Sequence, residues 1–356
     1  MNVIISSINT LSITSLHQLI TLFLNKKQCA RLGFNFHKVS SIVPILVELN
    51  NMIGIDHIKK TLIKHIIYFI SISNQKEQSI TPPKLHSIIF GPPGVGKTKF
   101  GMLLSQLIVK LGCIKYKQDQ HSIGSKILCD NSLIEPSSHQ TKYSDKQTIP
   151  FVIVNRSDLI AGYVGQTAIK TQNVINKSFG GCLFIDEAYS IGDNNKDSFS
   201  NECIDTLNQN LTENADKFIC ILAGYKDDII NKLLNQNKGL IRRFPFIYEI
   251  ENYNGTQLFE IFKTIVYNDK CDIDNTITKH FFNTHYKEFP FFGGDLETFY
   301  FECKLANSLR LFKLGENRDN IILNINDLNS ALTSFINNRE IIYPKQPEQE
   351  LNDLYL

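Results

Sequence analysis

The chain has 356 residues, of which 42% are hydrophobic and 20% are charged, and its formal net charge is +2. A chain of this length and composition can bury a sizeable core, which excludes a disordered or fibrous protein. The near balance of 37 basic and 35 acidic residues lacks the basic excess that is typical of nucleic-acid-binding proteins. Nucleic acid is therefore not the expected partner.

The N-terminal segment carries almost no charge up to residue 25, but Ser, Thr and Asn interrupt every apolar run. It matches neither a signal peptide nor a membrane-spanning helix, so we expect a soluble protein without a membrane span. Its pattern predicts an amphipathic helix at Leu16–Leu24 that packs on the main domain, with docking to a partner as the alternative. We interpret residues 1–50 as an N-terminal extension that is helical.

From residue 51 to residue 253, short apolar runs alternate with helical stretches, which is typical of an α/β domain with a parallel sheet. Helices are predicted at 99–111, 168–179 and 199–213. The polar stretch 112–149 fits neither pattern and is predicted to be an insertion, with disorder favoured over a functional loop. Five strands are predicted, at Ser87–Phe90, Phe151–Val154, Cys182–Ile185, Phe218–Ala223 and Phe246–Ile250.

Beyond Tyr253 the strand signal ends, and helical periodicity predicts a small all-helical domain over residues 254–340. Leu305, Leu309 and Phe312 recur at helical spacing in one of its segments. The last sixteen residues, 341–356, are left as a tail. The predicted helices of this domain are 256–267, 275–288, 296–314 and 327–338.

The cysteines indicate the redox environment. Eight are spread along the chain without a CxxC pair, so neither a zinc site nor a disulfide framework is predicted. Cys182 and Cys220 lie within predicted buried strands, where a thiol packs as a small hydrophobe. We therefore expect the cytoplasm or another reducing compartment.

A phosphate-binding loop follows the first predicted strand. The segment from Gly91 to Thr98 reads GPPGVGKT, which matches the P-loop, or Walker A, pattern between a strand and a helix. Its glycines allow successive N–H groups to face phosphates, Lys97 adds a positive charge, and the hydroxyl of Thr98 suits Mg²⁺. The predicted nucleotide-binding residues here are Pro93, Gly94, Val95, Gly96, Lys97, Thr98 and Lys99.

Two carboxylates end the third predicted strand, in the manner of a Walker B motif. Asp186 would hold Mg²⁺ together with Thr98, and Glu187 would orient or activate the water that attacks the γ-phosphate. Acidic pairs at the start of a loop are common. The pair indicates catalysis only because a P-loop stands upstream. Together the two motifs predict a nucleotide hydrolase.

Four segments carry a resemblance to one family: Phe90–Thr98, Ser157–Ala168, Gly180–Tyr189 and Leu222–Asp227. They resemble the AAA+ ATPases of the CbbX and stage V sporulation protein K type. The resemblance implies an AAA+ α/β domain with a five-stranded sheet and a helical lid, binding ATP and Mg²⁺ in a homo-hexameric ring. CbbX proteins are red-type Rubisco activases, so Rubisco is the expected client only for a true CbbX protein.

Further site residues follow from the resemblance. Tyr163, Val164 and Gly165 match the aromatic pore loop that grips a polypeptide in the central channel, with packing of the tyrosine beside its own helix as the alternative. Arg243 aligns with the arginine finger that reaches a neighbour's nucleotide, and Arg242 is the second candidate. Ile53 and Gly54 resemble the segment that lines the adenine pocket.

Two positions depart from the AAA+ pattern. Tyr225 stands where most AAA+ proteins carry a polar sensor residue. The lid segment Gly293–Leu296 lacks the usual sensor arginine, and Lys304 and Arg310 lie nearby but out of register. The resembling family shares the tyrosine, whereas the missing lid arginine would alter the coupling between lid and nucleotide and would allow slow hydrolysis.

These features favour an ATP-driven remodelling motor or chaperone that acts on a protein client. The first alternative is a clamp-loader or helicase-type motor on nucleic acid, which would need basic residues along the pore, whereas the segment 157–171 contains Lys170 as its one cation. The second alternative is a nucleotide-gated assembly scaffold that hydrolyses little ATP.

Overall fold

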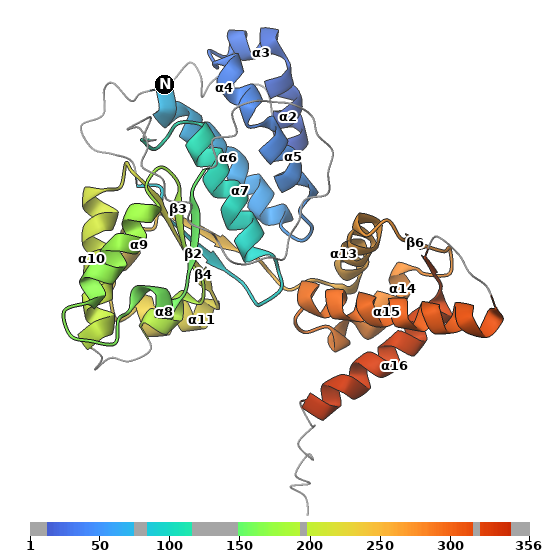
Figure 1. Ribbon diagram of the computed structural model, residues 1–356. Helices are drawn as coiled ribbons and strands as arrows, with labels where there is room; N and C mark the ends of the chain where they lie inside the picture. The colour runs from blue at the N-terminus through green and yellow to red at the C-terminus, as the bar shows by residue number, and fades with distance from the viewer. Residues whose placement is uncertain (1–12, 75–83, 116–148, 193–197, 316–320, 343–356) are drawn as a thin grey trace, which may run out of the picture. The chain divides into compact units, whose positions relative to one another are not determined.

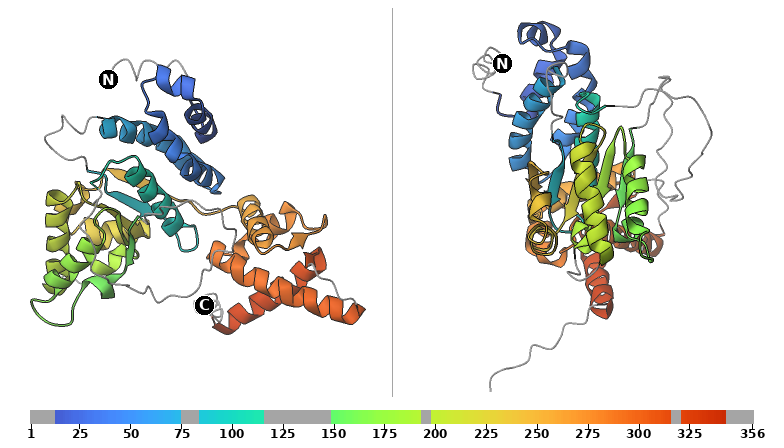
Figure 2. Two further views of the ribbon diagram at one scale, coloured as in Figure 1. Left: turned by 45° about the horizontal axis from the view of Figure 1, so that its top comes forward. Right: turned by 90° about the vertical axis from the view of Figure 1, so that its left-hand side faces the viewer.

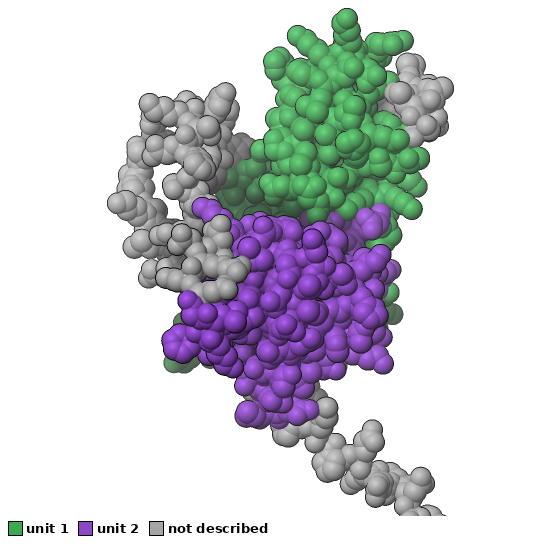
Figure 3. Space-filling view, turned by 90° about the vertical axis from the view of Figure 1, so that its right-hand side faces the viewer, with its two compact units in different colours: residues 1–51, 57–90, 98–248 green, residues 52–56, 91–97, 249–356 purple. Residues whose placement is uncertain are grey.

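The computed structural model describes residues 13–74, 84–115, 149–192, 198–315 and 321–342. Many of its elements are labelled in Figure 1, and its two compact units are coloured separately in Figure 3. The first unit comprises residues 1–51, 57–90 and 98–248. The second comprises residues 52–56, 91–97 and 249–356.

A five-stranded sheet with the order β2-β3-β4-β1-β5 forms the centre of the first unit. Parallel pairing aligns Ile185 with both Val154 and Leu222, and Phe90 with Gly224, so four strands end at one edge of the sheet. The predicted fold class is confirmed, and each strand lies within one residue of its predicted position. The strands are β1 (Ser87–Phe90), β2 (Phe151–Val154), β3 (Cys182–Ile185), β4 (Ile219–Gly224) and β5 (Phe246–Glu249).

Helices cover both faces of this sheet, because the central strands are apolar on both sides. Leu183 and Ile185 of β3 share a buried cluster with Leu207 of α10 and with residues of α9. On the other face, a Cβ atom on Gly101 of α7 would come within 2.7 Å of the Phe184 ring. Figures 1 and 2 show these two layers. The four main helices are α6 (Asp56–Asn74), α7 (Lys97–Lys110), α9 (Thr167–Lys177) and α10 (Ser198–Glu213).

Short helical turns connect these elements. One short helical turn follows each of β2, β3 and β4 at the edge where those strands end. A π-helix and a further short helix then lead to β5. In chain order they are α8 (Arg156–Leu159), η1 (Ala188–Ile191), α11 (Lys226–Asp228), η2 (Ile229–Leu234) and α12 (Lys238–Ile241).

Four helices precede α6 among the described residues of the first unit. The helix predicted at Leu16–Leu24 is present with those bounds as α2, and a capping box between Ser15 and Gln18 begins it. Leu16, Leu19 and Phe23 are buried where α2 packs against α4 and α5. The apolar face of α2 is thus covered within the chain. The other helices are α3 (Lys26–Arg31), α4 (Phe36–Ser41) and α5 (Val43–Asn51).

The second unit contains a helical bundle with an aromatic core, in which Phe299 contacts the rings of Phe262, Phe282, Phe289 and Phe335. Two parallel strands of two residues each, β6 and β7, were not predicted, because such short strands show no alternation of polarity. The elements are α13 (Gly255–Asn268), β6 (Asp272–Ile273), α14 (Lys279–His285), η3 (Tyr286–Glu288), α15 (Gly293–Leu314), β7 (Ile322–Leu323) and α16 (Ile325–Ile342).

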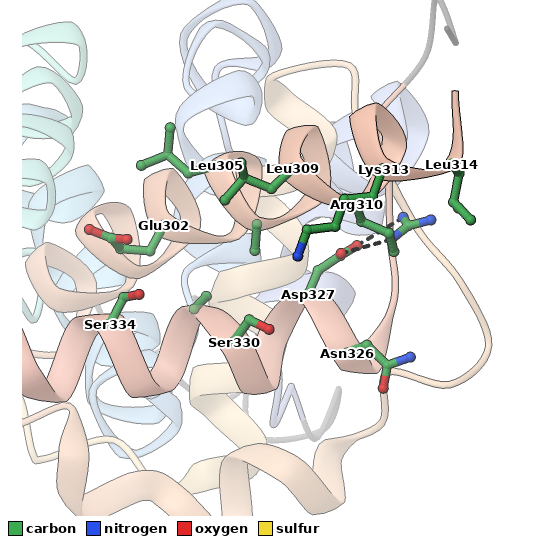
Figure 4. A pocket seen from close by; sticks show the side chains of 12 residues that line it. Glu302, Leu305, Leu309, Arg310, Lys313, Leu314, Asn326, Asp327, Ser330 and Ser334 are labelled. Atoms are coloured by element: carbon green, nitrogen blue, oxygen red, sulfur yellow. Dashed lines mark hydrogen bonds and ion pairs between the residues drawn. The ribbon is translucent and has the colours of Figure 1, made fainter. Parts of the chain in front are cut away.

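The apolar stripe that predicted α15 does not contribute to this core. Leu305, Leu309 and Phe312 are exposed, Phe312 by 84%. Leu305 and Leu309 line a hollow of about 610 Å³ between α15 and α16 (Figure 4).

Several sequence expectations fall on residues that are not described. Residues 116–148 of the predicted insertion 112–149 lie outside the described residues. The predicted tail lies outside them from residue 343 onward. The seven cysteines within the described ranges are all free thiols, and Cys182 and Cys220 are fully buried. Among the described residues, no cluster of side chains could hold a metal ion, and no helix is long and apolar enough to cross a membrane.

His86 joins three elements in the interior of the first unit. Its Nδ1 accepts a hydrogen bond from the Cys220 N–H at 3.0 Å, so its Nε2–H donates to the Leu211 carbonyl at 3.2 Å. Burial lowers the pKa of His86 to about 4, and the bond to Leu211 opposes that shift only in part. The folded protein therefore holds this imidazole neutral.

This gives a prediction on stability. Between pH 6.5 and pH 4 the unfolded chain binds a proton at His86 that the folded chain excludes, so stability falls as the pH is lowered through this window. From pH 7 to pH 5 the loss due to His86 should be about 2 kcal/mol. In urea unfolding followed by circular dichroism, His86→Asn should remove this part of the pH dependence, whereas His57→Asn, at an exposed histidine, should retain it. An unchanged pH dependence in His86→Asn would contradict the assignment.

Candidate active site

The P-loop begins at the residue after β1 and belongs to the second unit up to Lys97. Gly94 and Gly96 have φ angles of 76° and 85°, which side-chain-bearing residues rarely adopt. The ammonium of Lys97 donates to the carbonyls of Gly91 at 2.9 Å and Pro92 at 2.7 Å. These bonds hold the positive charge of Lys97 against the turn of the loop.

The segment predicted to line the adenine pocket lies beside the P-loop within the same unit. Gly54 has a φ angle of 78°, and a Cβ atom there would come within 2.3 Å of the Tyr253 ring. The hydroxyl of Tyr253 donates to the carbonyl of Val95 at 2.8 Å. Burial raises the pKa of Tyr253 to about 12, so this donor keeps its proton at neutral pH. Tyr253 thus joins residues 53–54 to the P-loop.

The turn that starts α15 also contacts the P-loop. A Cβ atom on Gly94 would lie 2.0 Å from the carbonyl oxygen of Phe291, and the N–H of Gly293 donates to the Gly94 carbonyl at 3.2 Å. Phe292, between them, has a φ angle of 48°, which is strained for a residue with a side chain. Glycine at positions 94 and 293 is therefore required by backbone-to-backbone packing.

The cations near the missing lid sensor are engaged within the lid itself. Lys304 donates to the Asp269 carboxylate at 3.0 Å. Arg310 bonds Asp327 through its Nε at 2.8 Å, and this pair lines the hollow of Figure 4. Within the segment Gly293–Leu296, which lacks the arginine, Asp295 accepts the Phe291 N–H at 2.6 Å and so fixes the turn before α15.

The Walker B pair follows β3 at the edge where β1 also ends. The N–H of Asp186 donates to the Val154 carbonyl at 2.9 Å, which extends the pairing of β3 with β2 by one residue. The N–H of Glu187 donates to Oδ1 of Asp186 at 3.0 Å. Glu187 is exposed, and its φ of 46° and ψ of 45° are left-handed. A strained, exposed carboxylate of this kind is characteristic of functional sites.

The predicted pore loop projects from the surface of the first unit. Tyr163 is 75% exposed and Val164 is 88% exposed, and Cβ atoms on Gly162 and Gly165 would meet nothing within 4 Å. The alternative reading, a tyrosine packed beside its own helix, does not fit this exposure.

Buried and charged groups anchor the base of the loop. Thr167 accepts the Ala161 N–H at 3.1 Å, and Thr171 donates to the Leu159 carbonyl at 3.0 Å. The ammonium of Lys170 donates to the carbonyls of Ser157 and Ile160. The loop is thus held firmly at its base and is open at its tip.

The two candidate finger residues differ in their surroundings. Arg243 Nε donates to the Thr212 hydroxyl at 2.9 Å, and its Nη1 donates to the Gly239 carbonyl. Arg242 is exposed. Arg243 would have to leave its partners in order to reach another subunit, whereas Arg242 would not.

The comparisons with known proteins agree with this geometry. Residues 87–251 match the model of the "ATPase family associated with various cellular activities (AAA)". The "Putative cfxQ-like protein R730" of Acanthamoeba polyphaga mimivirus is 33% identical over 341 residues, covering 94% of this chain and 75% of that relative. The chain belongs to the AAA ATPases. Within that family it groups with the CbbX (CfxQ) and stage V sporulation protein K type.

Two further relatives match about two thirds of this chain. "Stage V sporulation protein K" of Bacillus subtilis is 32% identical over 67% of this chain and 64% of its own length. "Protein CfxQ" of Xanthobacter flavus is 29% identical over 67% of this chain and 65% of its own length. The chain therefore spans slightly less than two thirds of the length of these two relatives.

The side chains in this AAA ATPase that were predicted to hold metal suit Mg²⁺ chemically. Thr98, in the first turn of α7, offers a hydroxyl, and Asp186 offers a carboxylate, which are the hard oxygen ligands that Mg²⁺ prefers. The positive-φ glycines and the N-terminus of α7 suit phosphate oxygens. Lys99 is exposed in that first turn.

Sequence reasoning missed some residues of the site. Tyr253 and Phe291 contact the P-loop from positions about 160 and 200 residues further along the chain, and nothing in the local pattern around either residue marks this role. The signal that could have pointed to them is the pair of glycines at 54 and 94, because each glycine leaves room for a close approach.

The bond from Tyr253 generates a prediction. Tyr253→Phe keeps the ring against Gly54 but removes the donor to the Val95 carbonyl, a bond worth about 1 kcal/mol net. We expect the affinity for ATP to fall about fivefold. Tyr267→Phe, the same change at an exposed tyrosine of α13, should leave the affinity unchanged. Equal ATP affinities in the two variants, measured by equilibrium titration, would show that Tyr253 does not support the P-loop.

Proposed function

We propose that this AAA ATPase is a protein-remodelling motor, in which ATP hydrolysis moves an aromatic pore loop against a polypeptide client within a ring of identical subunits. The observation that carries the proposal is the exposure of Tyr163 and Val164 on a loop with an anchored base. Large apolar side chains exposed together on a rigid support favour contact with another molecule. An aromatic tip can hold many kinds of side chain through apolar contact.

ATP binding in this proposal rests on the P-loop, and hydrolysis rests on Glu187. Lys97 contacts the phosphates, and Thr98 and Asp186 hold Mg²⁺, which when bound neutralises charge on the transferring phosphoryl group. Glu187 orients the attacking water and accepts its proton. Ile53 and Gly54 line the pocket for the adenine ring of ATP.

An arginine from the neighbouring subunit completes the proposed site. The family pattern favours Arg243 for this role. The exposure of its side chain favours Arg242 instead. Either guanidinium would stabilise the charge that develops on the γ-phosphate, an effect worth roughly 10³ to 10⁵ in rate in related phosphoryl-transfer systems. A homo-hexamer is the ring that the family resemblance implies.

The electrostatics of the loop favour a polypeptide client over nucleic acid. Binding to nucleic acid requires basic side chains that reach phosphates. The one cation of the segment 157–171, Lys170, directs its ammonium to the carbonyls of Ser157 and Ile160. The loop tip therefore presents apolar surface and no positive charge.

The test replaces the gripping side chain. With fluorescently labelled, permanently unfolded casein as a generic polypeptide, Tyr163→Ala should lose most ATP-dependent binding and most stimulation of hydrolysis, because a methyl group offers far less contact area than a phenol ring. Tyr163→Phe should keep both. The measurements are fluorescence anisotropy with a non-hydrolysable ATP analogue and the rate of phosphate release with and without casein.

Tyr286→Ala, at an exposed tyrosine of the lid, is the matched control and should behave as the unaltered protein. Casein binding that survives in Tyr163→Ala would contradict the gripping role and favour the scaffold. Binding of single-stranded DNA that displaces casein would favour a nucleic-acid motor instead.

A further inference from the structure

Arg156 connects the helix before the pore loop to the turn after the Walker B pair. It is the first residue of α8, and its Nη1 donates to the Ser190 carbonyl at 2.7 Å and to the Ser200 hydroxyl at 2.8 Å. The Ile191 carbonyl lies 3.5 Å from the same nitrogen. All these residues belong to the first unit, and Arg156 itself is half-buried.

The contact of Arg156 with Ser190 stabilises the turn that starts at Glu187. The Ser190 N–H donates to the Glu187 carbonyl at 2.8 Å, which closes the 3-10 turn η1. The last carbonyls of a helical turn have no partner within it, and a basic side chain can supply one. The left-handed backbone of Glu187 needs its surroundings to hold it in place, since such a conformation costs roughly 1–3 kcal/mol. Arg156 provides part of that support.

On its other side, Arg156 is rigidly joined to the pore loop. Asn155 and Asp158 form a capping box that begins α8, so Arg156 is fixed at the start of the helix. The Leu159 carbonyl at the end of α8 accepts the Thr171 hydroxyl, and Lys170 bonds the carbonyls of the same short stretch. A displacement of α8 would therefore move the base of the loop that carries Tyr163.

We infer that Arg156 is a positioning residue that couples the Glu187 turn to the Tyr163 loop, so that a change of nucleotide at the Walker B pair shifts the pore loop. The inference rests on the proposed function and deepens it by naming the link between hydrolysis and grip. Arg156 does not act on the nucleotide or on the client; it acts through η1 and α8. Backbone pairing joins β2 to β3, and the side chain of Arg156 extends that connection beyond the strand ends.

The test uses the absence of tryptophan from the sequence. Tyr163→Trp introduces a single fluorescent reporter at the loop tip. In the Tyr163→Trp variant we expect the emission maximum of the tryptophan to differ between the states bound to ADP and to a non-hydrolysable ATP analogue. Adding Arg156→Ala should abolish the difference while the affinity for ATP stays within about twofold, since the P-loop is unaltered.

Three further variants serve as controls. Arg156→Lys should restore part of the emission difference, because an ammonium can still donate to the Ser190 carbonyl. Ser200→Ala removes one acceptor and should reduce the difference without abolishing it. Arg31→Ala, which removes a guanidinium from the surface helix α3, should leave the difference intact.

The outcomes separate the inference from the proposed function. A full emission difference in Arg156→Ala would overturn the inference and leave the gripping role of Tyr163 untouched. No nucleotide-dependent emission in Tyr163→Trp itself would overturn coupling between the two sites altogether. If Arg156→Ala fails to fold, full differences in both Arg156→Lys and Ser200→Ala overturn the inference, and reduced differences support it. Loss of casein binding in Tyr163→Ala is a separate result, which tests the grip alone.

Discussion

Parallel pairing of β1, β4, β3 and β2 is the constraint on which the site depends. Because parallel strands in register end at one edge, the residues that follow three of them within the first unit are gathered there: Arg156 after β2, Asp186 after β3 and Tyr225 after β4. Ligands of open α/β sheets bind at this edge. The buried, two-faced apolar strands stabilise the sheet so that the loops beyond their ends can carry exposed and strained residues such as Glu187.

Glycine contacts impose the second constraint, within the unit that contains the P-loop. Gly94 accepts the backbone of Phe291 at a distance that no side chain permits, and Gly54 does the same for the Tyr253 ring. The P-loop is therefore shaped by the segment 52–56 and by the turn before α15 as well as by its own sequence. The segment Gly293–Leu296 contains no arginine, and the nearby cations Lys304 and Arg310 bond acidic groups of the lid.

Most of the α/β domain could be predicted because its strands and motifs are marked by residues that are neighbours in the sequence. Each strand is a short apolar run bounded by turn residues, and the P-loop and the Asp186–Glu187 pair are contiguous motifs. The contacts of Tyr253 with Val95, of Gly94 with Phe291 and of Arg156 with Ser190 could not be predicted, since they join residues far apart whose local patterns are ordinary. The strands β6 and β7 were missed because two residues cannot show a period of alternating polarity. The exposed stripe of α15 shows that helical spacing predicts a helix but does not tell which of its faces is buried.

The central claim is that Lys97 binds ATP and Glu187 hydrolyses it, and comparison of two variants tests this most directly. Glu187→Gln should bind ATP with nearly unaltered affinity, because an amide replaces a carboxylate that contacts water rather than phosphate, yet single-turnover hydrolysis should fall by at least about a hundredfold, which is within the range for a general base. Lys97→Ala should lose binding itself. Normal turnover in Glu187→Gln, or normal ATP affinity in Lys97→Ala, would contradict the assigned roles.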